Sequence, residues 1–464
     1  MTFRTESDSM GEVKIPSEYL YGASTQRAVE NFEISKRRFD RRFIEALCLI
    51  KWAAAMANKD LGKLDAKLAD KIAEKALETA EGKHDRHFVL DIYQTGSGTS
   101  TNMNANEVIA NLANPELGGA VGSKKPVHPN DHVNMGQSSN DVIPAAIHLG
   151  AALGIAKGLI PALKTLEASL NRKAKQFADL VKVGRTHLQD ATPVTLGQEF
   201  SGYASQVLHG IQRMTQALEG LMELPIGGTA VGTGINTHPK FASKVCELLS
   251  QKTEVTFSEA KNHFEAQAAK DACVFASGAL KSVAVSLMKI ANDIRWLSSG
   301  PRCGIGEIFL PELQPGSSIM PGKVNPVIPE SVMQISAQVQ GNDLAVQIGG
   351  QHGNFELNVM MPVITGNLFE SVELLQNGAR MLAEKCVDGI EPNSGRMKEL
   401  LDKSLMLVTN LNSVIGYDKA AQIAKKAFQS NKTIRELLLA EKLLPEDQIN
   451  KLLDPKTMLS PKNG

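Results

Sequence analysis

The sequence lacks the features that mark disulfide-stabilised, zinc-binding and nucleic-acid-binding proteins. Its five cysteines are scattered and odd in number, and they include no CxxC pair. This pattern argues against a disulfide framework or a zinc cluster and favours a reducing compartment. Lysine plus arginine and aspartate plus glutamate number 50 each, so no net charge attracts nucleic acid or an anionic membrane.

Membrane and export signals are also missing from the sequence. No run of 18 apolar residues suggests a membrane span, and Met1–Glu12 has no apolar core of a signal peptide. We therefore expect a cytoplasmic protein with no membrane and no nucleic-acid partner. An anionic substrate would have to be recognised by local groups, because the chain as a whole is neutral.

The length of 464 residues allows a large core and roughly two to four domains. Residues 1–137 mix short helical patterns with Gly-, Asn- and Thr-rich segments, residues 138–392 carry long amphipathic helices, and residues 393–464 carry shorter, charged ones. We predict a mainly α protein with a mixed, mostly helical N-terminal domain, a central bundle of five long helices and a small C-terminal helical domain.

Apolar residues in the central stretch recur at steps of three and four, which is the spacing of one helix face. Such faces run over 159–177, 196–221 and 276–297, and further helices fit 330–348 and 355–386. Pro161 is tolerated near a helix start, Thr192-Pro193 is expected to open the second helix, and Pro362 should kink the last helix or lie in its first turns.

Much of the remaining surface predicted for these helices is small and apolar. Examples are Ala145, Ala146, Ala151, Ala152 and Val285. Helices with apolar residues on several sides are buried on several sides. The pattern favours an oligomer over a large monomeric bundle.

The segment at 94–104, QTGSGTSTNMN, is richer in small polar residues than a helical bundle needs. Its glycines, Gly96 and Gly98, would let a ligand approach the backbone closely. Its hydrogen-bond donors for that ligand are Ser97, Thr99 and Asn102. A helical pattern follows, so its N–H groups would face an anion. A capping turn without a ligand is the alternative interpretation.

The segment His128–Asp141 places Ser138, Ser139 and Asn140 just before a long helix. Either Ser139 caps that helix or the three residues bind a carboxylate at its positive end, and the two interpretations are compatible. The histidines and aspartate at 128–132 match no standard metal-ligand spacing, so we expect no metal site.

His187 lies in the segment Gly184–Pro193, on a connection between two long helices. A histidine flanked by Arg185, Thr186 and Asp190 is a candidate general acid or base. A surface histidine in a polar loop explains the segment equally well.

The segment at 316–326, GSSIMPGKVNP, combines glycines, prolines and serines with a lysine and an asparagine. Such a connection is typical of a functional loop or lid. Lys323 and Asn325 would stabilise a carboxylate or a developing oxyanion, and Glu330 in the next helix would orient a base. A structural Ω-loop would explain the glycines and prolines but not the Lys-x-Asn pair.

The segment Gly227–Gly234, GGTAVGTG, is rich enough in glycine to suggest a dinucleotide site. No βαβ pattern surrounds it, and no acidic residue is placed for a ribose. We predict a turn with close backbone approach.

Together and in this order, the polar segments resemble the fumarase/aspartase superfamily, whose members eliminate a group from C2 of a succinyl-type substrate and leave fumarate. GSSIMPGKVNP resembles the superfamily signature, and GRTHLQD at 184–190, GSGT at 96–99 and QSSND at 137–141 resemble its other blocks. The match runs from Tyr21 to Asp418, and four spaced motifs in the right order are very specific.

Within the superfamily the chain looks most similar to class II fumarases, over 186–199, 226–234, 299–307 and 320–323. Three features depart from that branch: VIPE at 327–330 and LNVMMP at 357–362 have an aspartase look, and Met135-Gly136 stands where many fumarases have Lys-Ser. The resemblance implies reversible hydration of fumarate to L-malate. Aspartate ammonia-lyase on the same fold is the alternative, and a non-enzymatic scaffold, which would not need the polar segments, is a third interpretation.

The resemblance also implies a three-domain fold, a small dicarboxylate substrate, no cofactor, no metal, and a homotetramer whose active sites combine segments from three subunits. Ser317 is the implied base, and Lys323 and Asn325 hold the aci-carboxylate intermediate. His187, polarised by Glu330, positions or activates the water, or protonates the leaving hydroxyl. The implied substrate-binding residues are Ser97, Gly98, Thr99, Ser138, Ser139, Asn140, Thr186 and Ser318. A second anion site is implied at Lys125, His128, Pro129, Asn130 and Asp131.

Overall fold

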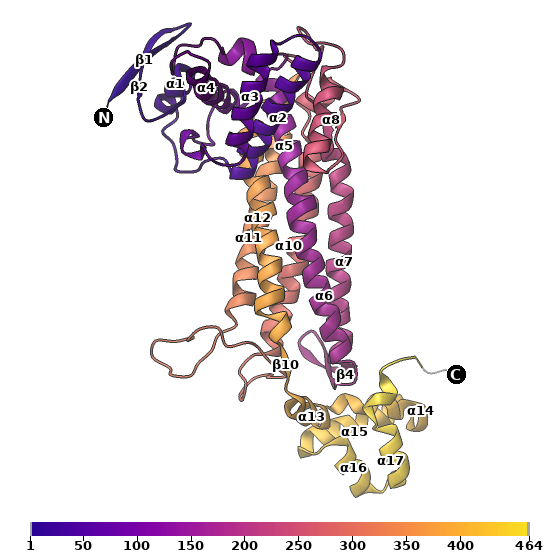
Figure 1. The fold of residues 1–464 in the computed structure, drawn as a ribbon. Helices are drawn as coiled ribbons and strands as arrows, with labels where there is room; N and C mark the ends of the chain where they lie inside the picture. Colours follow the sequence, from indigo (N-terminus) through magenta and orange to yellow (C-terminus); the bar gives the residue numbers. More distant parts are fainter. Residues whose placement is uncertain (1, 462–464) are drawn as a thin grey trace. The chain divides into compact units, whose positions relative to one another are not determined.

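The computed structural model describes residues 2–461, most of which are helical (Figure 1). Contacts divide the chain into two compact units. Unit 1 comprises Met1–Ala162, Gly210–Val285 and Ile335–Asn377, and unit 2 comprises Leu163–His209, Ser286–Gln334 and Gly378–Gly464.

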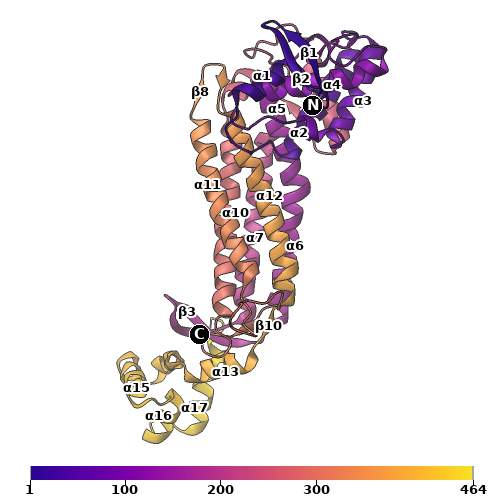
Figure 2. The ribbon, with the colours of Figure 1, turned by 90° about the vertical axis from the view of Figure 1, so that its left-hand side faces the viewer.

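Five long helices contribute residues to both units. They are α6 (Ile160–Gln176), α7 (Leu196–Leu221), α10 (Asp271–Leu297), α11 (Val327–Gly350) and α12 (Met361–Lys385). Within each unit their segments run side by side (Figures 1 and 2). The predicted five-helix bundle is confirmed, and the side chains expected on its inner faces, among them Leu166, Phe200 and Leu287, are buried.

Unit 1 adds shorter elements to these segments. They are β1 (Phe3–Asp8), β2 (Gly11–Pro16), α1 (Ala23–Asn31), α2 (Arg41–Asp60), α3 (Ala66–Ala80), α4 (Thr99–Glu116), α5 (Ser139–Leu153), β5 (Glu223–Leu224), α8 (Phe241–Thr253), β6 (Ser258–Glu259), α9 (His263–Ala268), β8 (Gly353–Asn354) and β9 (Leu357–Asn358). The strands form two-stranded pairs, and only β5 and β6 are parallel among those described. Apolar residues of α2, α3 and α4, such as Ala55, Ile72 and Ile109, form one core.

Unit 2 contains a hairpin, a second antiparallel strand pair formed by segments far apart in the sequence, and the C-terminal helices. They are β3 (Val181–Thr186) with β4 (Gln189–Thr195), β7 (Ile308–Phe309) with β10 (Glu391–Pro392), α13 (Ser394–Lys403), α14 (Asn412–Ile415), α15 (Tyr417–Ser430), α16 (Ile434–Glu441) and α17 (Glu446–Leu452). Val183 of β3 is buried in the same core as Leu411, Leu438 and Ile449. The C-terminal helices therefore support the hairpin that carries His187.

The helix expected to begin near Pro161 is α6, which starts at Ile160, but it does not follow a loop. α5 and α6 belong to one helical run, Ser139–Gln176, and the π-helical segment Gly154–Leu159 joins them. Proline has no N–H to donate, and its ring crowds the carbonyl four residues earlier. The wider π turn before Pro161 gives its ring more room within the continuous helical run.

The helix start predicted at Thr192-Pro193 is wrong, because both residues lie in β4. The helix begins at Leu196, and Thr195 caps it: Gln198 N–H donates to Thr195 Oγ1 at 3.0 Å, and Thr195 N–H donates to Gln198 Oε1 at 2.9 Å. Pro193 is tolerated because a strand of a two-stranded sheet needs no hydrogen bond on its outer side.

Two further expectations change. The last long helix begins at Met361 and not at Phe355, with Pro362 in its first turn as one prediction allowed. Residues 353–358 form the β8–β9 hairpin instead.

The alanines expected on the surface, Ala145, Ala146, Ala151 and Ala152, are buried within the chain, whereas Val285 is exposed.

Two helical spans, Ser139–Gln176 and Asp271–Leu297, have the length and apolar composition of membrane spans. Their most apolar windows are 72% and 50% buried inside the protein. Bundle helices that form a protein core share this composition, so the observation is weak evidence for a membrane span.

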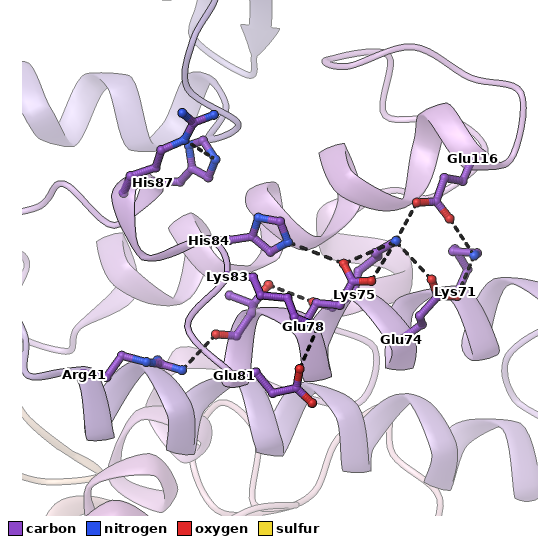
Figure 3. Close-up of polar contacts among 12 residues, drawn as sticks. Arg41, Lys71, Glu74, Lys75, Glu78, Glu81, Lys83, His84, His87 and Glu116 are labelled. Atoms are coloured by element: carbon purple, nitrogen blue, oxygen red, sulfur yellow. Dashed lines mark hydrogen bonds and ion pairs between the residues drawn. The ribbon is translucent and has the colours of Figure 1, made fainter.

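A network of opposite charges joins α3 to the end of α4 in unit 1 (Figure 3). Lys71 and Lys75 both contact Glu116, at 2.7 and 2.5 Å, and Lys75 also contacts Glu74 and Glu78. Hydrogen bonds from Lys71 and Lys75 lower the pKa of Glu116 to about 2 from an ordinary 4.5. The network therefore stabilises unit 1 when its carboxylates are ionised.

Glu116→Gln should make unfolding of the protein less sensitive to acid. The folded-state pKa of Glu116 is depressed, so its contribution is complete above about pH 4.5 and is lost as the pH falls toward 2. We expect the melting temperature of the parent chain to fall more steeply through this window than that of the variant, measured by circular dichroism. Glu81→Gln, which removes one exposed pair with Lys83, is the control and should change the slope less. Identical slopes for the parent and Glu116→Gln would contradict the prediction.

A cluster of four charged residues, two of them half-buried, holds the β3–β4 hairpin in unit 2. Lys182 Nζ lies 2.8 Å from Glu199 and 3.1 Å from Glu307, and the guanidinium of Arg185 donates to both oxygens of Glu307 at 2.9 and 3.1 Å. The side chains of Lys182 and Glu307 are completely buried. Burial raises the pKa of Glu199, and the charge of Lys182 opposes that rise.

Glu307→Gln should destabilise the protein strongly, because it leaves two cations in the cluster with one carboxylate. Breaking a buried ion pair from one side costs about 3–5 kcal/mol. Urea denaturation at neutral pH would measure this loss. Glu399→Gln removes exposed pairs with Arg396 and Lys403 and should cost at most about 1 kcal/mol. Equal stability of the two variants would refute this account of the cluster.

Candidate active site

The residues singled out by sequence fall into two groups, one in each unit. Ser97, Gly98, Thr99 and the segments 125–131 and 138–140 belong to unit 1. Thr186, His187, the 316–326 segment and Glu330 belong to unit 2. Each group has its own local geometry.

The start of α4 places two hydroxyl groups beside each other in unit 1. Ser97 Oγ and Thr99 Oγ1 lie 2.7 Å apart, on either side of Gly98, which caps the helix with a φ of 71°. A Cβ on Gly98 would lie 2.9 Å from the side chain of Ile143, and one on Gly96 would lie 2.0 Å from the Val359 carbonyl oxygen. The glycines therefore permit close packing within the protein at this helix start, and their expected approach to a ligand stays a prediction.

The start of α5 presents the second set of polar groups. Ser138, and not Ser139, is the N-cap, and it forms a capping box with Asp141. Asn140 Nδ2 donates to the Ala230 carbonyl at 2.8 Å. Ser139 accepts a hydrogen bond at 3.0 Å from Asn102, whose amide therefore serves the protein and does not reach a ligand as expected.

Asp141 was missed by the sequence analysis, although the Ser-x-x-Asp spacing of a capping box contains it. Its buried carboxylate accepts from Ser138 N at 2.9 Å, Gly227 N at 3.0 Å and Thr229 N at 2.9 Å. Burial raises the pKa of Asp141 to about 6, and these three hydrogen bonds oppose the rise. The segment 227–234 is the predicted turn, and its N–H groups bind this carboxylate.

His187 stands at the tip of the β3–β4 hairpin in unit 2. Thr186 pairs with Gln189, so His187 and Leu188 form a two-residue turn with φ values of 55° and 59°. Positive φ is costly for residues other than glycine and is often retained at functional sites. Arg185, one residue before Thr186, anchors the hairpin to Glu307.

The 316–326 segment folds back on itself as a closed loop. Gly316 N donates to the Lys323 carbonyl at 2.7 Å, and Asn325 Nδ2 donates to the Gly316 carbonyl at 2.8 Å. Lys323 Nζ donates to Asn325 Oδ1 at 2.5 Å, so the predicted Lys-x-Asn pair is formed. Ser318 and Lys323 are exposed, and Ser317 is half-buried.

The Ser317 oxygen is held by the backbone of its own loop. Its Oγ accepts hydrogen bonds from Ile319 N at 3.3 Å and Met320 N at 3.1 Å. Hydrogen bonds of this kind favour the charged form of the acceptor. The loop geometry therefore suits an alkoxide at Ser317.

The expected partnership of His187 with Glu330 is not formed within one chain. Glu330 lies half-buried in the first turn of α11, and His187 is exposed at the hairpin tip. Across residues 2–461 no hydrogen bond joins the two side chains. The partnership remains a prediction that would require a second subunit.

Three of the five residues expected at the second anion site line a cavity of about 600 Å³ in unit 1, and Pro129 and Asn130 do not. Lys125, His128 and Asp131 line it, together with Lys124 and His132. His128 Nδ1 accepts from the backbone N–H groups of Asn130 and Asp131, both at 3.2 Å. In the part of the chain that the structure describes, no three His, Cys, Asp or Glu side chains converge as metal ligands.

Comparison with known proteins places this geometry in a family. A lyase family model matches residues 11–341, and a model described as the fumarase C C-terminus matches residues 407–460. The class II fumarate hydratase of Nitrosomonas europaea is 53% identical, over 98% of this chain and 99% of its own length. That of Corynebacterium glutamicum is 55% identical, over 98% and 96%.

A solved structure agrees with these sequence matches. The crystal structure of recombinant class II fumarase from Schistosoma mansoni superimposes with a TM-score of 0.96 at 40% identity, over 100% of both chains. The predicted superfamily and fold are therefore confirmed. The chain belongs to the fumarase/aspartase superfamily and, within it, to the class II fumarases.

Proposed function

We propose that the chain is a hydro-lyase that catalyses the reversible hydration of fumarate to L-malate by trans addition of water. Support comes from the full-length similarity to relatives named class II fumarate hydratase and from the retained polar segments. The aspartase alternative is not favoured, because no relative reported above carries that name despite the aspartase-like features at 327–330 and 357–362.

The single observation that supports the chemistry most directly is the environment of Ser317. In the dehydration direction a base removes the C3 proton of malate, and the electron pair moves into the adjacent carboxylate to give an aci-carboxylate. The intermediate then expels the C2 hydroxyl as water. Two backbone N–H groups at Ser317 Oγ support its role as that base in the alkoxide form.

The remaining roles follow the chemistry of each group. Lys323 and Asn325, already paired in the loop, would stabilise the aci-carboxylate. His187 on its hairpin, polarised by Glu330 of another subunit, would protonate the leaving hydroxyl or position the water. Hydroxyl and amide donors of the protein would bind the two carboxylates of the substrate. These donors belong to Ser97, Gly98, Thr99, Ser138, Ser139, Asn140, Thr186 and Ser318. No metal or other cofactor takes part in this scheme.

The cavity beside Lys125 and His128 would bind a second small anion, together with Pro129, Asn130 and Asp131. The ammonium group of a lysine suits a carboxylate.

The protein would act as a cytoplasmic homotetramer. The long helices expose apolar side chains that one chain does not cover, including Phe275 at 58%, Leu344 at 56% and Trp296 at 43%. The loop residue Ile319 is 84% exposed. Such residues, exposed in the single chain, would be buried between subunits in the assembly. Active sites shared among subunits would unite the two groups of residues.

The proposed domain limits remain 1–137, 138–392 and 393–464.

Ser317→Ala should lower malate dehydration by several orders of magnitude without unfolding the protein. Loss of a general base alone costs about 10²–10⁴-fold in rate, and loss of a stabilised alkoxide should cost at least the upper end of this range. Fumarate absorbance, with malate and separately with aspartate as substrate and with no added metal or nucleotide, measures the activity. Activity of the parent chain on aspartate alone would reverse the choice between hydratase and ammonia-lyase.

His187→Asn is the comparison for Ser317→Ala and should cost less, because water can partly replace a group that positions water. Exchange of the malate C3 proton with solvent deuterium distinguishes the two roles. We expect exchange to be lost in Ser317→Ala. Near-normal exchange there, with exchange abolished in His187→Asn, would make His187 the base.

Sedimentation velocity should show a homotetramer at micromolar concentration. The reason is the apolar surface of the long helices, so Phe275→Lys should weaken assembly and lower activity with it. Val414→Lys is a control at an exposed apolar residue of the C-terminal helices. A monomeric parent chain with full activity would contradict the shared-site assembly.

A further inference from the structure

Beneath the Ser138–Asn140 segment, unit 1 contains a charged side chain that the sequence analysis did not single out. Lys51 lies in α2 and is completely buried. Its Nζ donates to Asn134 Oδ1 and to Gln137 Oε1, both at 2.9 Å. No carboxylate lies within ion-pair distance of this nitrogen among the described residues. The two amide oxygens therefore replace the water molecules that would otherwise solvate the ammonium.

The hydrogen bonds continue from Lys51 to the proposed substrate site. Asn134 Oδ1 also accepts from Asn102 Nδ2 at 3.2 Å, and Asn102 Nδ2 donates to Ser139 Oγ at 3.0 Å. A lysine ammonium can only donate, so it fixes which end of the Asn134 amide is the oxygen. The orientation of Asn102 follows, because its nitrogen must face that oxygen.

The end of this chain is the hydroxyl group of Ser139. Its oxygen accepts from Asn102, so its own proton remains available for another acceptor. Ser138, Ser139 and Asn140 are neutral, whereas a dicarboxylate substrate carries two negative charges. A buried ammonium behind this segment offsets the negative charge of the Asp141 carboxylate in the same turn, and low dielectric increases its effect.

We propose that Lys51 is a positioning residue for the substrate carboxylate, acting through Asn134 and Asn102 to hold the Ser139 hydroxyl as a donor. This inference rests on the proposed function, because it assumes that Ser139 binds the dicarboxylate. It adds a residue from α2, a helix that supplies none of the substrate-binding groups named above.

The charge state of Lys51 gives the proposal a second readout. Burial lowers the pKa of Lys51 to about 7, and the charge of Asp141 on α5 and the thiol of Cys48 on α2 oppose that change. The ammonium is therefore present below about pH 7 and is lost as the pH rises. The KM for malate should rise over the same interval in the parent chain.

The test compares Lys51→Met with Lys270→Met, a matched control. Lys270 is also completely buried in unit 1, but its Nζ donates to the Ala266 carbonyl at 2.9 Å and to no part of the substrate segments. We expect Lys51→Met to raise the KM for malate about tenfold, with kcat changed less than about threefold, and to flatten the pH dependence of KM. Lys270→Met should leave KM and its pH profile as in the parent chain.

Asn102→Ala cuts the same hydrogen-bond chain while it keeps Lys51 and both of its acceptors. It should raise KM similarly, and combining it with Lys51→Met should add little, since the two residues act in series. Asn104→Ala is its control, because this buried asparagine of the same helix donates to the His87 carbonyl. If Lys51→Met does not fold, Asn102→Ala against Asn104→Ala still decides the question.

The outcomes separate this inference from the proposed function. An unchanged KM in the folded Lys51→Met and Asn102→Ala variants, with normal fumarate hydration by the parent chain, would overturn the role of Lys51 alone. Additive effects of the two substitutions would overturn the serial connection. Absence of hydration by the parent chain would overturn the proposed function, and the role of Lys51 with it.

Discussion

The carboxylate of Asp141 is the interaction on which the arrangement of unit 1 depends. A buried carboxylate is costly unless its lone pairs are filled, and here three backbone N–H groups from two distant segments fill them. One segment is the start of α5, and the other is the glycine-rich turn at 227–234. Joining them fixes the direction of the first turn of α5, and with it the positions of Ser139 and Asn140.

Both units place buried charged groups next to a polar segment that carries proposed site residues. In unit 1 Lys51 and Asp141 lie under the start of α5, and in unit 2 Lys182 and Glu307 lie at the base of the hairpin that carries His187. Such groups contribute little net stability compared with apolar residues of the same size. Their role here is to orient the neighbouring segment, because their hydrogen bonds can form in only one arrangement of it.

The bundle was predictable from the sequence because helical burial is a local pattern: Leu166, Phe200 and Leu287 repeat at intervals that any packed helix requires. The four polar segments were recognisable for a different reason, since their residue types exceed what packing needs. The β3–β4 hairpin was missed because Thr-Pro has the same local preferences at a helix start and in an edge strand. Lys51 was missed because its acceptors lie more than 80 positions away in the chain.

The π-helical segment Gly154–Leu159 limits how the gene for this protein can change in length. A π turn holds one more residue than an α turn, and one residue corresponds to about 100° of rotation about the helix axis. Losing a single codon here would let the helix return to α geometry and would turn Leu163, Leu166 and Leu170 away from the core. The close approach of Gly158 to Gln376 on α12 would be lost as well. Relatives with this bundle should therefore differ in length within their loops and termini, and keep the residue count between Ser139 and Gln176 constant.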